Sequence, residues 1–190
     1  MMKYFDDYIP NTYLQYYFFG NELAKKENPE YTRVDEAKNG REKKVYEICR
    51  KAEEQGTLGN LPFLIGEIHG NMMVEIAESI AYDLNNEFVL MMKNEGIIKN
   101  LDRNMLVEVG AKLGKDGAAP YGYDKIGDFY KALIDNQYMY EKLTVEACFE
   151  NNYKKALQAL TLNRTVINPE TAELILNDLT EVNKKYWNLK

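Results

Sequence analysis

Two short apolar runs of strand length lie in the middle of the chain, between stretches that have helical periodicity. The runs cover residues 87–92 and 105–109, and a turn at residues 94–96 follows the first. Apolar residues recur at helical spacing before and after these runs, over residues 32–55, 69–84, 124–151, 153–162 and 169 onward. Because helices and strands are grouped rather than alternating, the pattern predicts an α+β fold and not a series of β-α-β units.

Turn and cap residues set the expected ends of these elements. Asp124 can cap the helix over 124–151, and Asn168 followed by Pro169 opens the last helix. Pro10 blocks a continuous helix near the start, and Gly56, Gly59, Asn60 and Pro62 mark a loop. A second, loose loop is expected over residues 114–117. The positions expected to face a core are Met73, Ile76, Ala77 and Ile80, then Ile126, Phe129, Leu133, Tyr140, Leu143 and Ala147, and finally Ala172, Ile175, Leu179 and Val182.

The composition argues against several classes of protein. A formal net charge of −6 over 190 residues does not suit a nucleic-acid-binding surface. No apolar run reaches the ~20 residues that span a bilayer, so no membrane association is expected. The first residues are acidic where a signal peptide would be basic, which predicts a soluble cytoplasmic protein. The length suits a single domain over residues 1–190, with residues 1–30 as an aromatic arm.

Cysteine and histidine are too few to build a metal site. Cys49 and Cys148 lie far apart and form no Cys-x-x-Cys motif, so we expect no disulfide framework and expect both to be buried as small apolar residues. The chain has one histidine, His69, which cannot build a zinc site by itself. We expect His69 to have a structural role or to support residues that contact the ligand.

The densest aromatic segment runs over Asn11-Thr12-Tyr13-Leu14-Gln15-Tyr16-Tyr17. The chain contains 15 tyrosines, and an aromatic run usually packs in a core, so the residues alone assign no catalytic role to Tyr13. Arg33 follows in the segment Tyr31-Thr32-Arg33-Val34-Asp35-Glu36. By itself it is typical of a solvated residue at the start of a helix.

Longer motifs extend over nearly the whole chain. They are Pro10-Asn11-Thr12-Tyr13-Leu14-Gln15-Tyr16-Tyr17, Thr32-Arg33, Gly40-Arg41-Glu42, Asn94-x-Gly96-x-Ile98-x-Asn100-Leu101, Val107-Glu108-Val109, Tyr140-Glu141-Lys142-Leu143-Thr144-Val145-Glu146-Ala147, Lys155-Ala156-Leu157-Gln158-Ala159-Leu160-Thr161-Leu162-Asn163 and Tyr186-Trp187. In these motifs the chain resembles the C-terminal half of the family 4 glycoside hydrolases, especially the 6-phospho-α-glucosidases.

The resemblance implies a fold and a reaction. The family's C-terminal domain looks like that of lactate and malate dehydrogenases, with long helices and a small antiparallel or mixed sheet. Its members hydrolyse glycosides by a redox-elimination route: NAD accepts a hydride from C3 of the sugar, and a base removes the proton from C2. A divalent metal, usually manganese, stabilises the charge that develops. The substrates are sugar 6-phosphates, here phosphorylated α-glucosides.

The resemblance also implies roles for individual residues. Tyr13 falls at the position of the base that acts at C2. A free tyrosine is a weak base, with a pKa of ~10, and a neighbouring metal cation can favour its phenolate. Arg33 falls at the position that binds the 6-phosphate, a task that suits its planar guanidinium. Asn11 and Thr12 flank the base and are expected to support it.

The N-terminal NAD-binding half of the family is not represented in this sequence. No Gly-x-Gly-x-x-Gly fingerprint is present. The resemblance places the metal ligands and the residues that protonate the leaving group in that other half. We therefore expect no NAD and no metal bound to this chain alone, and no activity without a separate NAD-binding half. Loops also depart from the family, as in Asn94-Glu95-Gly96-Ile97-Ile98-Lys99-Asn100, where two small residues have become larger.

Two functions remain open at this point. The chain is part of a 6-phospho-α-glucosidase, or it is a non-catalytic module that dimerises or binds sugar phosphate. A related 6-phospho-β-glucosidase or α-galactosidase specificity is a further alternative. In either case we expect a homo-oligomer, because an exposed apolar face invites self-association.

Overall fold

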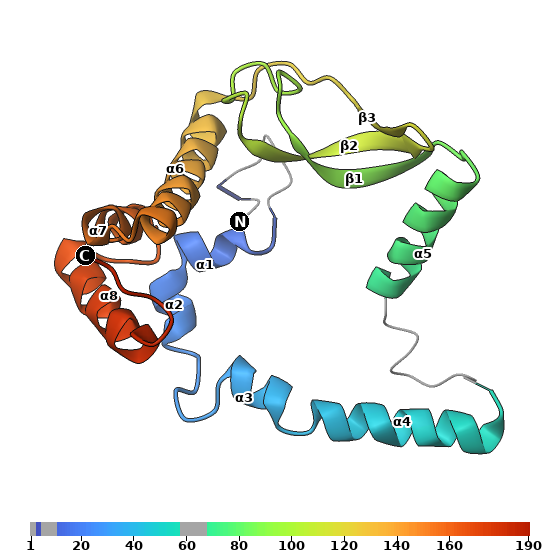
Figure 1. The fold of residues 1–190 in the computed structure, drawn as a ribbon, viewed down its shortest axis with the longest axis horizontal. Helices are drawn as coiled ribbons and strands as arrows, with labels where there is room; N and C mark the ends of the chain where they lie inside the picture. Colours follow the sequence, from blue (N-terminus) through green and yellow to red (C-terminus); the bar gives the residue numbers. More distant parts are fainter. Residues whose placement is uncertain (1–2, 5–10, 58–67) are drawn as a thin grey trace. The chain divides into compact units, whose positions relative to one another are not determined.

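The computed structural model describes residues 3–4, 11–57 and 68–190, which form helices and one small sheet (Figure 1). In chain order the elements are α1 (Leu14–Phe18), α2 (Gly20–Ala24), α3 (Arg33–Lys38), α4 (Arg41–Gln55), α5 (Ile68–Ala81), β1 (Asn86–Lys93), β2 (Leu106–Gly114), β3 (Gly117–Pro120), α6 (Asp128–Glu150), α7 (Tyr153–Leu162) and α8 (Pro169–Asn183). The α+β class expected from the sequence is confirmed. Pro10, Gly59, Asn60 and Pro62, which were expected to break helices or form a loop, lie outside the described residues.

The chain divides into two compact units. Unit 1 consists of Met1–Asn21, Met91–Glu108 and Gly122–Lys190, and unit 2 consists of Glu22–Leu90 and Val109–Tyr121. Unit 1 contains α6, α7 and α8, whereas unit 2 contains α3, α4 and α5. None of the described helices is both long and apolar enough to cross a membrane.

The core of unit 1 lies where α6, α7 and α8 pack together (Figure 1). Its buried members are Ala147, Ala156, Leu176 and Leu189, and Trp187 packs against them. The alanines allow the helices to approach closely. Helix α7 spans the predicted residues, and the Asn152 side chain caps it by accepting a hydrogen bond from the Lys155 N–H at 3.0 Å. The predicted cap of α8 is also present, since the Asn168 side chain accepts from the Thr171 N–H at 2.8 Å.

The buried face of α8 differs from the prediction. Ala172 and Leu176 are buried, whereas Leu179 and Val182 are exposed. Residues 172 and 176 are four apart and therefore share a narrow stripe on the helix. This stripe contacts α7, and the neighbouring stripe with Leu179 and Val182 has no such partner among the described elements.

Helix α6 begins later than expected. It starts at Asp128, with Gly127 at the N-cap, and Asp124 does not cap it. The Asp124 carboxylate instead accepts a hydrogen bond from the Lys99 ammonium at 2.5 Å, and this bond holds the pKa of Asp124 below its usual value. The segment before α6 is therefore attached to the loop that follows β1.

That loop, residues 94–104, is organised by one buried side chain. The Asn94 amide donates to the carbonyls of Ile98, Leu101 and Asp102 at 3.0–3.1 Å, and its oxygen accepts from the Ile98 N–H at 2.7 Å. Asn100 exchanges a further pair of hydrogen bonds with the backbone of Ile126, at 2.9 and 3.0 Å. The predicted turn at residues 94–96 is present, with Gly96 at φ +104°.

The sheet has the strand order β1-β2-β3 and is antiparallel. Both predicted strands are present, but β2 continues to Gly114 and pairs with a third strand that was not predicted. The pairing ends at Gly114↔Gly117, so Lys115 and Asp116 form a two-residue hairpin turn. The prediction of a loose loop over residues 114–117 is therefore wrong. Gly117 has a φ of +105°, a conformation that suits glycine.

Unit 2 contains two helices where one was expected over residues 32–55. Helix α3 ends at Lys38, and α4 begins after Gly40, which has a φ of +107°. A backbone in the left-handed region cannot continue a right-handed helix. Gly56, with φ +64°, ends α4 as predicted.

Helix α5 is predicted well in extent but not in burial. Met73 and Ile80 are exposed, and the buried position is Ser79. The Ser79 hydroxyl donates to the Leu113 carbonyl at 2.7 Å and accepts from the Asn86 N–H at 3.2 Å. This serine therefore joins α5 to both β1 and β2. The two cysteines are also exposed, so their expected burial is wrong.

Candidate functional site

The predicted base, Tyr13, stands at the start of α1 on a turn that Asn11 shapes. The Asn11 side-chain oxygen accepts a hydrogen bond from the Tyr13 N–H at 2.8 Å, and the Asn11 carbonyl accepts from the Leu14 N–H at 3.1 Å. An asparagine that bonds to the backbone two residues later stabilises such a turn. Asn11 therefore fixes the backbone from which the Tyr13 ring projects.

The Tyr13 phenol is accessible. The side chain is 69% exposed, and its ring stacks against Tyr16 with centroids 6.3 Å apart. Thr12 is exposed as well, and its carbonyl accepts from the Gln15 N–H at 3.4 Å. An exposed phenol on a defined turn can approach a ligand directly.

Arg33, the predicted phosphate ligand, is the first residue of α3. Thr32 and Asp35 form a capping box around it: the Asp35 carboxylate accepts from the Thr32 N–H at 2.8 Å and from its hydroxyl at 2.7 Å. The bond from the Thr32 hydroxyl is the largest cause that lowers the pKa of Asp35. The exposed Arg33 side chain thus starts from a well-defined helix end. Tyr13 belongs to unit 1 and Arg33 to unit 2.

A cavity of about 800 Å³ lies within unit 1 and was not foreseen from the sequence. Residues before and within α1 form one wall, and they include Asn11, Leu14, Tyr17 and Phe18. Residues near the ends of β1 and β2 form a second wall, and residues 133–146 of α6 contribute to a third. The lining is mainly apolar, with charged groups that include Glu108, Glu141, Lys142 and Arg164. The Arg164 guanidinium lies 5.0 Å from the centre of the Phe18 ring.

Sequence spacing carried a signal for this cavity. Leu14, Tyr17 and Phe18 follow the spacing of one helix face, and Ile134, Tyr138 and Val145 do the same on α6. Tyr13, on which the sequence motif centres, does not line the cavity, although its supporting residue Asn11 does.

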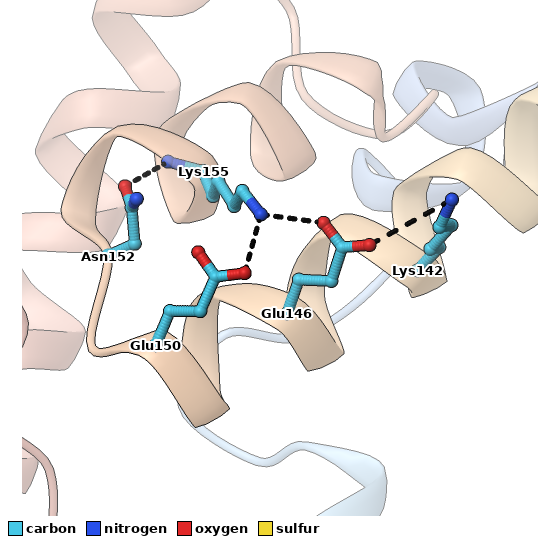
Figure 2. A network of polar contacts seen from close by, with 5 residues as sticks. All are labelled: Lys142, Glu146, Glu150, Asn152 and Lys155. Carbon is cyan, nitrogen blue, oxygen red and sulfur yellow. Dashed lines mark hydrogen bonds and ion pairs between the residues drawn. The ribbon is translucent and has the colours of Figure 1, made fainter.

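One ion-pair network joins α6 and α7 (Figure 2), and two of its members, Lys142 and Glu146, line the cavity. The Lys155 ammonium of α7 lies 2.8 Å from the Glu146 carboxylate and 2.7 Å from that of Glu150, both on α6. Lys142 approaches Glu146 at 3.9 Å. The bond from Lys155 lowers the pKa of Glu146, and the two carboxylates raise the pKa of Lys155. This arrangement joins two helices and leaves Glu146 charged at neutral pH.

The described residues do not supply a metal site. In residues 3–4, 11–57 and 68–190, no three His, Cys, Asp or Glu side chains gather closely enough to hold an ion. His69 is exposed on α5.

Comparison with known proteins now places the chain in a family. Residues 1–166 match the sequence pattern of the family 4 glycosyl hydrolase C-terminal domain. The chain belongs to this family. The predicted fold class is likewise that of the family's C-terminal domain. This chain is 44% identical to the phospho-α-glucosidase PagL of Clostridium acetobutylicum. The matched region covers 99% of this chain and 43% of that relative. The 6-phospho-β-glucosidases of Thermotoga maritima and Escherichia coli are less similar, at 27% and 25% identity.

Solved structures of family members give the same result. A 6-phospho-α-glucosidase from gut microorganisms in complex with NAD and Mn²⁺ matches the whole chain at 41% identity and a TM-score of 0.89. Another, in complex with NAD and glucose 6-phosphate, matches at 35% identity and 0.88. The chain covers 43% of each of these proteins. It thus spans less than half the length of the family members that it matches.

Proposed function

We propose that this chain is the C-terminal part of a 6-phospho-α-glucosidase, a hydrolase of phosphorylated α-glucosides. The observation that carries the proposal is the 44% identity to a phospho-α-glucosidase over 99% of the chain, against 27% or less to the 6-phospho-β-glucosidases. The same comparison favours the α-glucosidase over the β-specific alternative. An α-galactosidase specificity stays the less supported alternative.

In this proposal Tyr13 takes the proton from C2 of the sugar. Its exposed phenol and the turn held by Asn11 support the role, because a base must reach its proton directly. Thr12, exposed beside it, is proposed to help position the base. The tyrosine must act as the phenolate, so its surroundings in the complete site have to favour the charged form.

Arg33 is proposed to bind the 6-phosphate. Its guanidinium can donate two parallel hydrogen bonds to phosphate oxygens, which gives both affinity and orientation. The capping box of Thr32 and Asp35 supports this role by defining the helix end from which Arg33 extends. Because this helix end is already formed, the backbone at Arg33 loses little conformational freedom when it binds.

No step of the proposal passes through a metal or NAD held by this chain. Among the described residues no three His, Cys, Asp or Glu side chains gather to hold an ion, and the sequence has no Gly-x-Gly-x-x-Gly fingerprint. Hydride transfer and charge stabilisation would need residues from the part of the family members that this chain does not span. We also propose that residues 1–190 act as one domain, that the protein forms homo-oligomers, and that it is cytoplasmic. The last point agrees with its proposed substrate, since a charged sugar phosphate does not cross a bilayer unaided.

The test uses a chimera in which the remaining part of the Clostridium relative is joined to this chain. We expect hydrolysis of p-nitrophenyl α-glucoside 6-phosphate by the chimera and none by residues 1–190 alone. Tyr13→Phe should lower kcat by about 10²–10⁴-fold, the range for loss of a general base. Tyr16→Phe is the matched control, because Tyr16 stacks on Tyr13 but has no proposed role.

Arg33→Met should raise KM for the phosphorylated substrate by about 10–100-fold, as expected for a lost charge-assisted hydrogen bond. Arg50→Met, at an exposed position of α4, should leave KM unchanged. Equal loss in the Tyr13 and Tyr16 variants would remove the case for Tyr13. A folded chimera that binds glucose 6-phosphate without hydrolysis would favour the non-catalytic module.

A further inference from the structure

We propose that β1 pairs with β1 of a second copy of this chain. The two strands run antiparallel about a two-fold axis at Leu90, and they join two three-stranded sheets into one. The inference rests on the homo-oligomer proposed above and gives that oligomer a surface. It does not depend on the hydrolase activity.

Strand β1 has a free edge. In the order β1-β2-β3 its one neighbour is β2, and no other described segment bonds to the backbone of residues 87–93 (Figure 1). The N–H of Asn94, directly after the strand, donates to the Met105 carbonyl at 2.8 Å and so faces β2. Backbone groups alternate in direction along an antiparallel strand. The residues whose N–H and C=O groups point outward are therefore Glu87, Val89, Met91 and Lys93.

The two edges of the sheet differ in how they are protected. Strand β3 has four residues and ends in Pro120, and a short strand with a proline is typical of an edge that does not pair. Strand β1 has eight residues and no proline. Its charged residues, Glu87 and Lys93, lie near its two ends, with the apolar residues 88–92 between them. A long apolar edge of this kind favours pairing with another strand.

Charge complementarity selects a second copy as the partner and sets the register. An antiparallel pair centred on Leu90 places Glu87 opposite Lys93 of the second copy, twice by symmetry. Both charges lie on the exposed face of the strand, where Val89 would meet Met91. Opposite charges directly across two strands stabilise their pairing. A slip of two residues loses both ion pairs, and a parallel pairing in register aligns like charges.

The contacts that these charges already make leave them able to pair. Lys93 lies 3.6 Å from Glu95, and its side chain is 51% exposed. Glu87 accepts from the Tyr121 hydroxyl through Oε1, so its other oxygen can accept a further bond. Exposed ion pairs contribute little affinity by themselves. The backbone hydrogen bonds of the paired edges supply the affinity, as in other strand additions, and the charges fix the register.

A disulfide at the two-fold axis tests this register. Because the backbone groups of Leu90 face β2, Leu90 and its copy form a non-hydrogen-bonded pair with Cα atoms ~4.5 Å apart, which a disulfide can bridge. In a chain with Cys49→Ser and Cys148→Ser, Leu90→Cys should give a covalent dimer on mild oxidation. Phe88→Cys is the matched control on the same face, since its copy lies four residues away along the strand, roughly 13 Å. It should cross-link at least about tenfold more slowly.

Charge reversal tests the ion pairs, with the dimer dissociation constant measured by sedimentation equilibrium. Glu87→Lys should weaken the dimer by about tenfold, because two attractive pairs become repulsive. Lys93→Glu should do the same, and the double variant should restore the dimer. Lys112→Glu, at an exposed position of β2, should leave the dissociation constant unchanged. Circular dichroism checks that each variant keeps its helices.

The outcomes separate this inference from the proposed function. A chain that stays monomeric in sedimentation overturns both the oligomer and the β1 pair. A dimer in which Leu90→Cys cross-links no faster than Phe88→Cys overturns the β1 pair and leaves the oligomer standing. Fast cross-linking at Leu90, together with rescue by the double charge reversal, supports the pair whether or not the chimera hydrolyses its substrate.

Discussion

Replacing Leu176 by alanine should destabilise unit 1 strongly. Leu176 is 1% exposed and packs with Ala147, Ala156 and Leu189. The change removes three carbon groups from a dry core, worth about 2.4 kcal/mol at ~0.8 kcal/mol each. The cavity left behind adds to this, and the short alanine side chains cannot move in to fill it. We therefore expect a loss of about 3–4 kcal/mol, within the range for such substitutions.

The assay is urea unfolding followed by tryptophan fluorescence. The chain has one tryptophan, Trp187, and it packs against the same core, so the signal reports on unit 1. With a slope of about 2 kcal/mol per molar urea, the midpoint should fall by about 1.5–2 M. Leu174→Ala is the control on the same helix, at an exposed position, and should shift the midpoint by less than about 0.5 M. Equal shifts for the two variants would refute the packing assigned to α8.

Three further substitutions test other parts of the structure. Gly114→Ala would place a Cβ 2.7–2.8 Å from side-chain oxygens of the α5–β1 turn. We expect it to lower the free energy of unfolding by about 2 kcal/mol, measured by thermal unfolding. In the control, Gly122→Ala, the added Cβ meets nothing within 4 Å, so the stability should not change. Glu146→Gln should lower the urea midpoint at pH 7. Because Lys155 lowers the pKa of Glu146 from its usual value, the ion pair contributes stability above that value, and the difference from wild type should shrink as the pH falls through the folded pKa. A difference that grows as the pH falls would contradict the ion pair. Asn94→Ala leaves three backbone carbonyls without their donor and should cost about 3 kcal/mol or more, measured by denaturant unfolding; a loss under 1 kcal/mol would show that the loop does not depend on this side chain.

The sequence predicted those elements whose ends carry their own chemical signal. The last helix has an asparagine cap and a proline at its first position, so its start was found. The strand β1 was found because its apolar run has a length and boundary typical of strands. By contrast, Gly40 interrupts a charged stretch whose apolar positions suit a single continuous helix. Only its positive φ, a property of the folded backbone, separates α3 from α4.

Burial was harder to predict than helix extent. Which face of α8 is buried depends on where α7 lies, and the two neighbouring apolar stripes are equivalent in the sequence. The third strand, β3, reads Gly-Ala-Ala-Pro and has no strand propensity of its own. It forms because β2 offers it an edge across a two-residue turn. Cys49 and Cys148 are exposed for a similar reason, because each lies on a face of its helix that no other described element covers.

For the candidate site, the residues were predicted from motif resemblance, because no local pattern points to them. Tyr13 is one of 15 tyrosines, and its turn is visible only once the Asn11 hydrogen bond is known. The structure adds the cavity, whose walls come from segments far apart in the chain. No spacing rule links Leu14, Leu106 and Ile134, because their proximity is a property of the fold.

The amide of Asn94 also offers a spectroscopic handle. Its NH₂ group is buried and donates to three carbonyls, so its hydrogens should exchange with solvent far more slowly than those of surface asparagines. In a nitrogen-15 correlation spectrum this pair of signals would persist after transfer to deuterated water. It would then report on the loop over residues 94–104 during a titration with sugar phosphate, without any label on the ligand.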